Sequence, residues 1–183
     1  RAASGQFRGG VISLDDAYYP GRGLRDDNLF ALNVETAIGE GLLRAKYYRH
    51  TNEGQGHWVT PYSASSPTLP LRLRTTEYLI DRDGVTASIE LPFGDIHTLT
   101  AGLWFERNEH NLQRNFYNLN PDSPPNRGFF YRHPDVRVFE QDFDTDTRVY
   151  FVNHRMALQE GRLLLDAGFR SMTVENQSIS RIG

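Results

Sequence analysis

Residues 85–107 of the chain read VTASIELPFGDIHTLTAGLWFER, and this stretch decides the fold. From Val85 to Leu91 every second residue is apolar, and the residues between them are Thr, Ser and Glu. The same alternation returns from Leu99 to Phe105, after a Pro-Phe-Gly-Asp turn at 92–95. Successive side chains of a β-strand point to opposite faces, so each run predicts a strand with one apolar and one polar face. Together the two runs predict an antiparallel hairpin.

The alternation continues along the chain on both sides of this hairpin. We expect six strands, over about residues 28–38, 42–52, 71–91, 96–108, 141–158 and 162–175. In five of them the two faces are clear, and the polar face carries Arg, Lys, His and Glu. Such a face is typical of a water-filled interior and not of a dry core.

The fifth strand is the least regular. We expect Phe143, Val149 and Phe151 on its apolar face. The opposite face then holds Asp142, Asp144, Asp146, Arg148 and Tyr150. The phase is disturbed near Asn153–Met156, where we predict a β-bulge.

The connections between strands alternate in length. Short turns are expected at Gly39–Gly41, 92–95 and Glu160–Gly161, and long proline-containing loops at about 53–70 and 109–140. In an up-and-down sheet all the short turns then lie at one end, as in outer-membrane barrels with short periplasmic turns and long extracellular loops. Lipid cannot hydrogen-bond an open sheet edge, and the smallest bacterial barrels have about eight strands. We therefore predict an all-β, antiparallel up-and-down transmembrane β-barrel segment that is a piece of a larger barrel.

Composition narrows the alternatives. The 183 residues are 38% hydrophobic and 23% charged, and the mean hydropathy of −0.57 fits both a soluble domain and a barrel of alternating strands. No run of about 18 apolar residues predicts a membrane-spanning helix. The net charge of −3 is spread without a basic stripe, which argues against nucleic-acid binding. Cysteine is absent, so neither disulfides nor zinc–thiolate sites are expected.

Aromatic residues are the candidate ligand-binding groups. Those on outward faces or near strand ends would form membrane-interface girdles, and we expect this of Phe30, Tyr47, Phe93, Phe105, Phe151 and Phe169. Those in the long connections would form a ligand-stacking mouth, or else pack the loops on one another; they are Trp58, Tyr62, Phe116, Tyr117, Phe129, Phe130 and Tyr131.

Chemical motifs are sparse. Asp142, Asp144 and Asp146 share a face, but the glycine and glutamate of an EF-hand loop do not follow them. Glu90 and Glu106 are a conceivable glycosidase pair. No nucleophile elbow, phosphate-binding loop or dinucleotide motif occurs. We expect no enzyme activity, no metal site and no cofactor.

Four stretches carry a resemblance to a known family. They are Ile80–Ala87, His97–Asn108, Arg114–Tyr117 and Leu165–Arg170, within a likeness that covers roughly residues 25–175. This pattern of strands and turns resembles the barrel of TonB-dependent receptors of Gram-negative bacteria. The resemblance implies a barrel of 22 strands with an N-terminal plug domain. It also implies import of a scarce ligand such as a ferric siderophore, vitamin B12 or an oligosaccharide, driven by the TonB–ExbB–ExbD system.

The chain departs from the full family pattern. Neither a plug nor a TonB-box segment is recognisable, and no terminal strand ends in an aromatic residue. The prediction is therefore that residues 1–183 are a partial receptor barrel in the cell outer membrane, in contact with lipid and a small-molecule ligand. The rival is a soluble β-barrel or β-sandwich that binds a ligand or carbohydrate, with the apolar faces turned into a core. A β-sandwich glycosidase is a third alternative.

Overall fold

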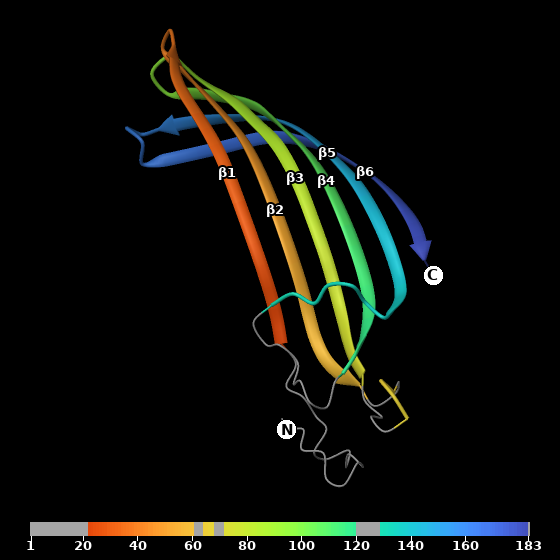
Figure 1. The fold of residues 1–183 in the computed structure, drawn as a ribbon. Helices are drawn as coiled ribbons and strands as arrows, with labels where there is room; N and C mark the ends of the chain where they lie inside the picture. The colour runs from red at the N-terminus through yellow and green to blue at the C-terminus, as the bar shows by residue number, and fades with distance from the viewer. Residues whose placement is uncertain (1–21, 61–63, 68–71, 120–128, 183) are drawn as a thin grey trace.

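One antiparallel sheet contains the described part of the chain. The computed structural model describes residues 22–60, 64–67, 72–119 and 129–182. The strands are β1 (Arg22–Ile38), β2 (Gly41–Thr60), β3 (Arg72–Phe93), β4 (His97–Asn118), β5 (Val136–Leu158) and β6 (Leu163–Ile182). They follow one another in the order β1-β2-β3-β4-β5-β6, so the topology is up-and-down (Figure 1). The predicted all-β class and the six antiparallel strands are confirmed.

The sheet is curved and open. Each strand pairs with its neighbours in sequence, and β1 and β6 are the two edges. The short connections, residues 39–40, 94–96 and 159–162, lie at one end of the strands, and the longer ones lie at the other, as predicted. Gly39, Gly94 and Gly161 each have a positive φ in these turns, a conformation that glycine adopts without steric cost. No helix within the described residues is long and apolar enough to cross a membrane.

The strands are longer than the sequence indicated, at the end away from the short turns. β2 continues to Thr60 and β4 to Asn118, and β5 begins at Val136, so much of the two predicted loops is strand. In these extensions both faces carry polar residues, which removes the alternation that reveals a strand. The backbone still pairs, because every N–H and C=O group removed from water needs a partner.

The register gives the sheet two different faces. Leu32 is opposite Tyr47, Tyr47 opposite Val85, and Val85 opposite Phe105, so these side chains share a face. We call this the band face, because its apolar residues run across all six strands near the short turns. They include Phe30, Leu32, Val34, Leu43, Ala45, Val85, Ala87, Ile89, Leu99, Ala101, Leu103, Val152, Leu165, Ala167 and Phe169. The opposite side is the polar face.

The predicted facing of β5 was wrong. Tyr150 is opposite Leu103 and Val152 is opposite Ala101, so the even-numbered residues of β5 lie on the band face. The three aspartates do share a face with Arg148, but it is the band face beyond its apolar part. Residues Phe143, Val149 and Phe151 lie instead on the polar face, where Val149 is buried.

The predicted bulge near Asn153–Met156 was also wrong. Pairing there is regular, and the register shifts lie at Arg114/Asn115 and Glu140/Gln141. Both faces of β5 carry apolar and polar residues, so the sequence alone did not show which residues share a face. An apolar side chain on the polar face is possible here because it covers glycine or aromatic neighbours on β4.

Three aromatic rings on the polar face lie over glycines of the neighbouring strand. Tyr48 is paired with Gly84, Tyr78 with Gly54, and Phe151 with Gly102. A Cβ atom built on any of these glycines would overlap the ring of its partner. The glycines thus leave the space that the rings fill, an arrangement that fixes strand register through cross-strand contacts.

Polar side chains on the same face form a network across the strands. Arg44 donates hydrogen bonds to Glu35 at 2.9 Å and to Glu90 at 3.3 Å, joining β1, β2 and β3. Tyr48 donates to Glu106 and accepts from the Trp104 indole N–H at 2.9 Å. These groups satisfy one another and remain partly accessible to water.

The glycine–ring contacts make a direct prediction about stability. We expect Gly102→Ala to lower the free energy of unfolding by about 1–3 kcal/mol, because its Cβ would lie 2.5 Å from the Phe151 ring and 2.6 Å from the Ala87 carbonyl oxygen. The matched control is Gly56→Ala, whose Cβ would meet only ordinary contacts at 3.8 Å and should change stability by roughly 0.5 kcal/mol or less. Denaturant unfolding of the full-length protein, followed by tryptophan fluorescence, measures both. Equal effects would contradict the role given to Phe151.

Candidate ligand-binding site

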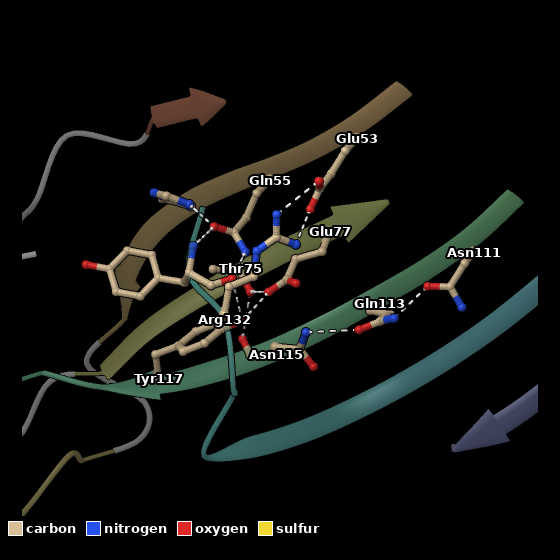
Figure 2. Close-up of polar contacts among 11 residues, drawn as sticks. Glu53, Gln55, Thr75, Glu77, Asn111, Gln113, Asn115, Tyr117 and Arg132 are labelled. Carbon is tan, nitrogen blue, oxygen red and sulfur yellow. Dashed lines mark hydrogen bonds and ion pairs between the residues drawn. The ribbon is translucent and has the colours of Figure 1, made fainter. Parts of the chain in front are cut away.

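A short segment crosses the band face beyond its apolar part. We call residues 129–135 the strap; they precede β5 and lie across β2, β3 and β4 (Figure 2). The Gln55 side chain holds the strap through both backbone groups of Tyr131, accepting from its N–H at 2.7 Å and donating to its C=O at 3.0 Å. At the other end, the Asp135 N–H donates to the Phe116 carbonyl at 3.0 Å. Gln55 is 2% exposed, so these bonds are shielded from water.

A small apolar cluster supports the strap from below. Val59, Leu73 and Tyr117 are buried on three adjacent strands, and Tyr131 packs against them. The rings of Tyr117 and Tyr131 are 5.1 Å apart at an angle of 50°, and the ring of His57 meets Tyr131 edge-on at 5.3 Å. Aromatic pairs in these geometries add stability beyond their buried area.

Glu77 lies beside this cluster, and one of its two carboxylate oxygens accepts hydrogen bonds. Thr75 donates to Glu77 Oε1 at 2.5 Å, and the Tyr117 hydroxyl donates to the same atom at 2.9 Å. Among the residues that the structure describes, Glu77 Oε2 receives no hydrogen bond. The carboxylate therefore has one oxygen fixed and one available to a donor.

Three amide side chains form a directed chain along β4. Asn115 donates to Gln113 Oε1 at 3.2 Å, and Gln113 donates to Asn111 Oδ1 at 2.6 Å. Figure 2 shows these two links, and Asn111 then donates to Asp142 at 2.6 Å and to Glu140 at 3.2 Å on β5. Because every donor points toward β5, the Asn115 Oδ1 atom at the start of the chain is buried without a donor within the described part of the chain.

These groups line a half-open cavity of about 340 Å³ under the strap. Two arginines also line it. Arg132 is paired with Glu53, through Nη2 and Oε2 at 3.1 Å, and this hydrogen bond raises the pKa of the Arg132 side chain. Arg137 is paired with Glu140 at 2.5 Å. The cavity thus combines hydrogen-bonding groups, paired charges and aromatic walls, and its volume lies at the lower end for small-ligand sites.

The structure brings together two of the predicted ligand-binding aromatics. Tyr117 and Tyr131 line the cavity, in contact with each other. Trp58 and Phe116 are strand residues on the polar face, where Arg74 stacks on Trp58 at 4.1 Å and Arg72 lies 5.9 Å from Phe116. Of the other three predicted aromatics, Phe129 is 69% exposed, the Phe130 ring lies 5.3 Å from the Arg132 guanidinium, and Tyr62 lies outside the described residues.

Sequence analysis missed Gln55, Glu77 and the amides of the site. The sequence does contain a signal for the three amides. Asn111, Gln113 and Asn115 are two residues apart, a spacing that places their side chains on one face of a strand. Because residues 109–140 were predicted to be a loop, this spacing was not recognised. Residues two apart share a face only when they belong to a strand.

The other chemical candidates remain apart. Glu90 pairs with Thr100 and Glu106 with Gly84, so the two carboxylates are six residues apart along β4, about 20 Å. A glycosidase pair needs about 5–10 Å. Asp142 is held by Asn111 and Arg181. In the part of the chain that the structure describes, no three metal-ligating side chains gather.

Comparisons with known proteins give a likeness in fold. No family model matches the chain, and no curated protein matches it in sequence. Among solved structures the chain is similar to BauA, the ferric preacinetobactin receptor from Acinetobacter baumannii, with a TM-score of 0.57 and 16% sequence identity over 86% of this chain. The chain spans 26% of the length of that receptor. At this identity the likeness shows a shared arrangement of strands.

Gln55 makes the site testable. We expect Gln55→Ala to release the strap, because the change removes two buried hydrogen bonds to Tyr131, each with a net value of about 1 kcal/mol. Amide hydrogen exchange of residues 129–135 in the full-length protein should become at least about tenfold faster. The control is Arg132→Gln, which breaks an exposed ion pair and should cost about 0–1 kcal/mol. Unchanged exchange in Gln55→Ala would mean that the strap is held by other contacts.

Proposed function

We propose that the chain is part of the wall of an outer-membrane receptor barrel, with its band face in lipid and its polar face toward a hydrated interior. The receptor imports a scarce small ligand and is not an enzyme. The observation that carries this proposal is the apolar band, which spans all six paired strands.

The height of the band fits a membrane. On β1 it extends from Phe30 to Ile38 and on β3 from Val85 to Leu91, which is about 20–27 Å at about 3.3 Å per residue. Transmembrane barrels have an apolar belt about 25 Å tall on strands that are tilted. Its side chains lie open on the sheet, with Phe30 60% and Phe169 69% exposed, so lipid or another protein layer has to cover them.

Both edges of the band carry aromatic rings. Toward the long connections the Phe30 and Tyr47 rings are 6.4 Å apart, and those of Phe105 and Tyr150 are 5.6 Å apart. Toward the short turns, Phe93 stacks on His97 at 5.1 Å. Amphipathic rings favour the two membrane–water interfaces. Of the residues expected in girdles, Phe151 lies on the polar face instead.

Charged residues begin directly beyond the aromatic edge of the band that faces the long connections. On the band face Arg49 pairs with Asp81 at 2.7 Å, and Arg148 with Glu175 at 3.6 Å. A change from apolar to aromatic to charged along one face is expected where a strand leaves the hydrocarbon region. A buried protein core would not require this order.

The identity of the receptor is the finer part of the proposal. An open six-stranded sheet cannot stand alone in lipid, so further strands of the parent protein close the barrel, which we take to be of the 22-strand type. The structural likeness to a ferric siderophore receptor supports this choice. It also supports a siderophore-like ligand. Coupling through a plug to the TonB–ExbB–ExbD system is proposed only from the resemblance of the sequence to TonB-dependent receptors.

The rival function is a soluble ligand-binding or carbohydrate-binding β-domain. In that case a second layer of the parent protein would cover the band. Taken alone, the polar network around Arg44 and Tyr48 does not distinguish a barrel from a soluble domain. Together with the aromatic edges of the band and the charged residues beyond them, it favours the barrel. Recovery of the full-length parent in the soluble fraction without detergent would contradict the membrane proposal.

Opposite faces of β4 should respond differently to a charge. We expect Leu103→Arg, on the band face near its middle, to lower the stability of the protein in lipid vesicles by about 2–4 kcal/mol. Thr100→Arg, on the polar face, is the matched control and should fold normally. The measurement is the folded fraction in vesicles, read from heat-dependent mobility on gels. Tolerance of arginine at both positions would argue against lipid at the band face.

Lipid contact can also be measured directly. The chain contains no cysteine, so single cysteines can carry a fluorophore. We expect a label at Leu103→Cys to be quenched by brominated acyl chains, and a label at the adjacent Trp104→Cys to be protected, because the two side chains point to opposite faces. Equal quenching at the two positions would contradict the assigned faces.

A further inference from the structure

We propose that the cavity under the strap binds a neutral saccharide, as a site separate from the transport path. The saccharide assignment rests on the cavity alone, whereas its most direct source, a lipid-linked sugar of the surrounding leaflet, rests on the proposed function. The cavity lies on the band face, and the transport path belongs to the polar face.

One buried acceptor and one accessible acceptor are open to a ligand in the cavity. Asn115 is 1% exposed, lines the cavity and has a buried Oδ1 atom with no donor among the described residues. Glu77 is half-buried and uses only Oε1 for Thr75 and Tyr117, so its accessible Oε2 atom is open to a further donor. A buried polar atom such as Asn115 Oδ1 is almost always hydrogen-bonded, so a ligand with several hydroxyl donors would complete this site.

The charges around the cavity favour a neutral ligand. Glu53 and Glu77 give the lining two negative charges, and Arg132 and Arg137 give it two positive ones, so the cavity has no net charge to attract a cation or an anion. Both arginines are already in ion pairs, Arg132 with Glu53 and Arg137 with Glu140. A sugar carries no charge, offers hydroxyl donors to Glu77 and Asn115, and presents C–H surface that suits Tyr131 and Leu79.

The position of the cavity indicates which sugars reach it. Asn111 lies six residues beyond Phe105 on the same face of β4, and Tyr117 twelve residues beyond it, about 20–40 Å along the strand. A lipid whose acyl chains pack on the band needs an extended oligosaccharide head to span that distance. Simple phospholipid head groups are too short.

The full-length parent protein, purified in detergent, tests the proposal by calorimetric titration. One probe is a glycolipid with an extended, neutral oligosaccharide head group, and the other is the same oligosaccharide without its lipid. We expect Glu77→Gln to weaken binding at least about tenfold, the typical effect of losing a hydrogen bond to a charged group. Leu79→Trp should also weaken it, because the larger side chain would occupy part of the cavity. The matched control is Glu109→Gln, on the same face of β4 outside the cavity, which should bind like the unchanged protein.

Each result either identifies the source of the saccharide or overturns the proposed binding site. Binding of both probes, sensitive to Glu77→Gln and Leu79→Trp, supports a saccharide site that needs no lipid. Binding of the lipid-linked probe alone, with the same sensitivity, supports a leaflet lipid as the source. Absence of binding to either probe, equal binding by all variants, or selective binding of spermidine would overturn the proposal. A parent protein found in the soluble fraction would overturn the membrane proposal and leave the oligosaccharide titration valid.

Discussion

The hydrogen-bond ladder between the strands, which is regular throughout the apolar band, is the constraint on which the rest of the structure depends. Across β2, β3 and β4 the pairing keeps one register from end to end, without a shift. Side chains alternate strictly with a period of two, so a constant register joins the apolar positions of every strand into one band. A slip of one residue in a single strand would place charged residues in that band. The glycine–ring pairs on the polar face, such as Gly102 with Phe151, help to exclude such a slip.

The same ladder explains why each face changes character along the strands. The apolar band occupies only the part of each strand near the short turns, and the strands continue well beyond it. Beyond the band, the backbone pairing no longer depends on apolar burial. Side chains there are free to make polar contacts, and the band face becomes a chain of amides and carboxylates around Glu77 and Asn115. One face of one sheet therefore has two parts, an exposed apolar band in one and a polar cavity in the other.

The strap converts that polar surface into a half-open cavity. Residues 129–135 cover the polar surface, held there by the hydrogen bond from Gln55 to Tyr131. The apolar cluster around Tyr117 supports them from below and sets their distance from the sheet. Without the strap, the amides on β4 would be ordinary solvated groups. A polar cavity of this kind is assembled from three strands and one connection, so no single segment of sequence encodes it.

The sequence by itself determined the all-β class, the six antiparallel strands, the order of short and long connections and the faces of five strands. It could do so because alternation and turn residues are local signals. Only the tertiary structure decided the ends of β2, β4 and β5, the facing of β5, and the partners of Tyr117 and Tyr131. The physical reason is that polar strand extensions carry no periodic signal, and both faces of β5 mix apolar and charged residues. Their positions follow from pairing with β4 and β6, an interaction between segments that are distant in the chain.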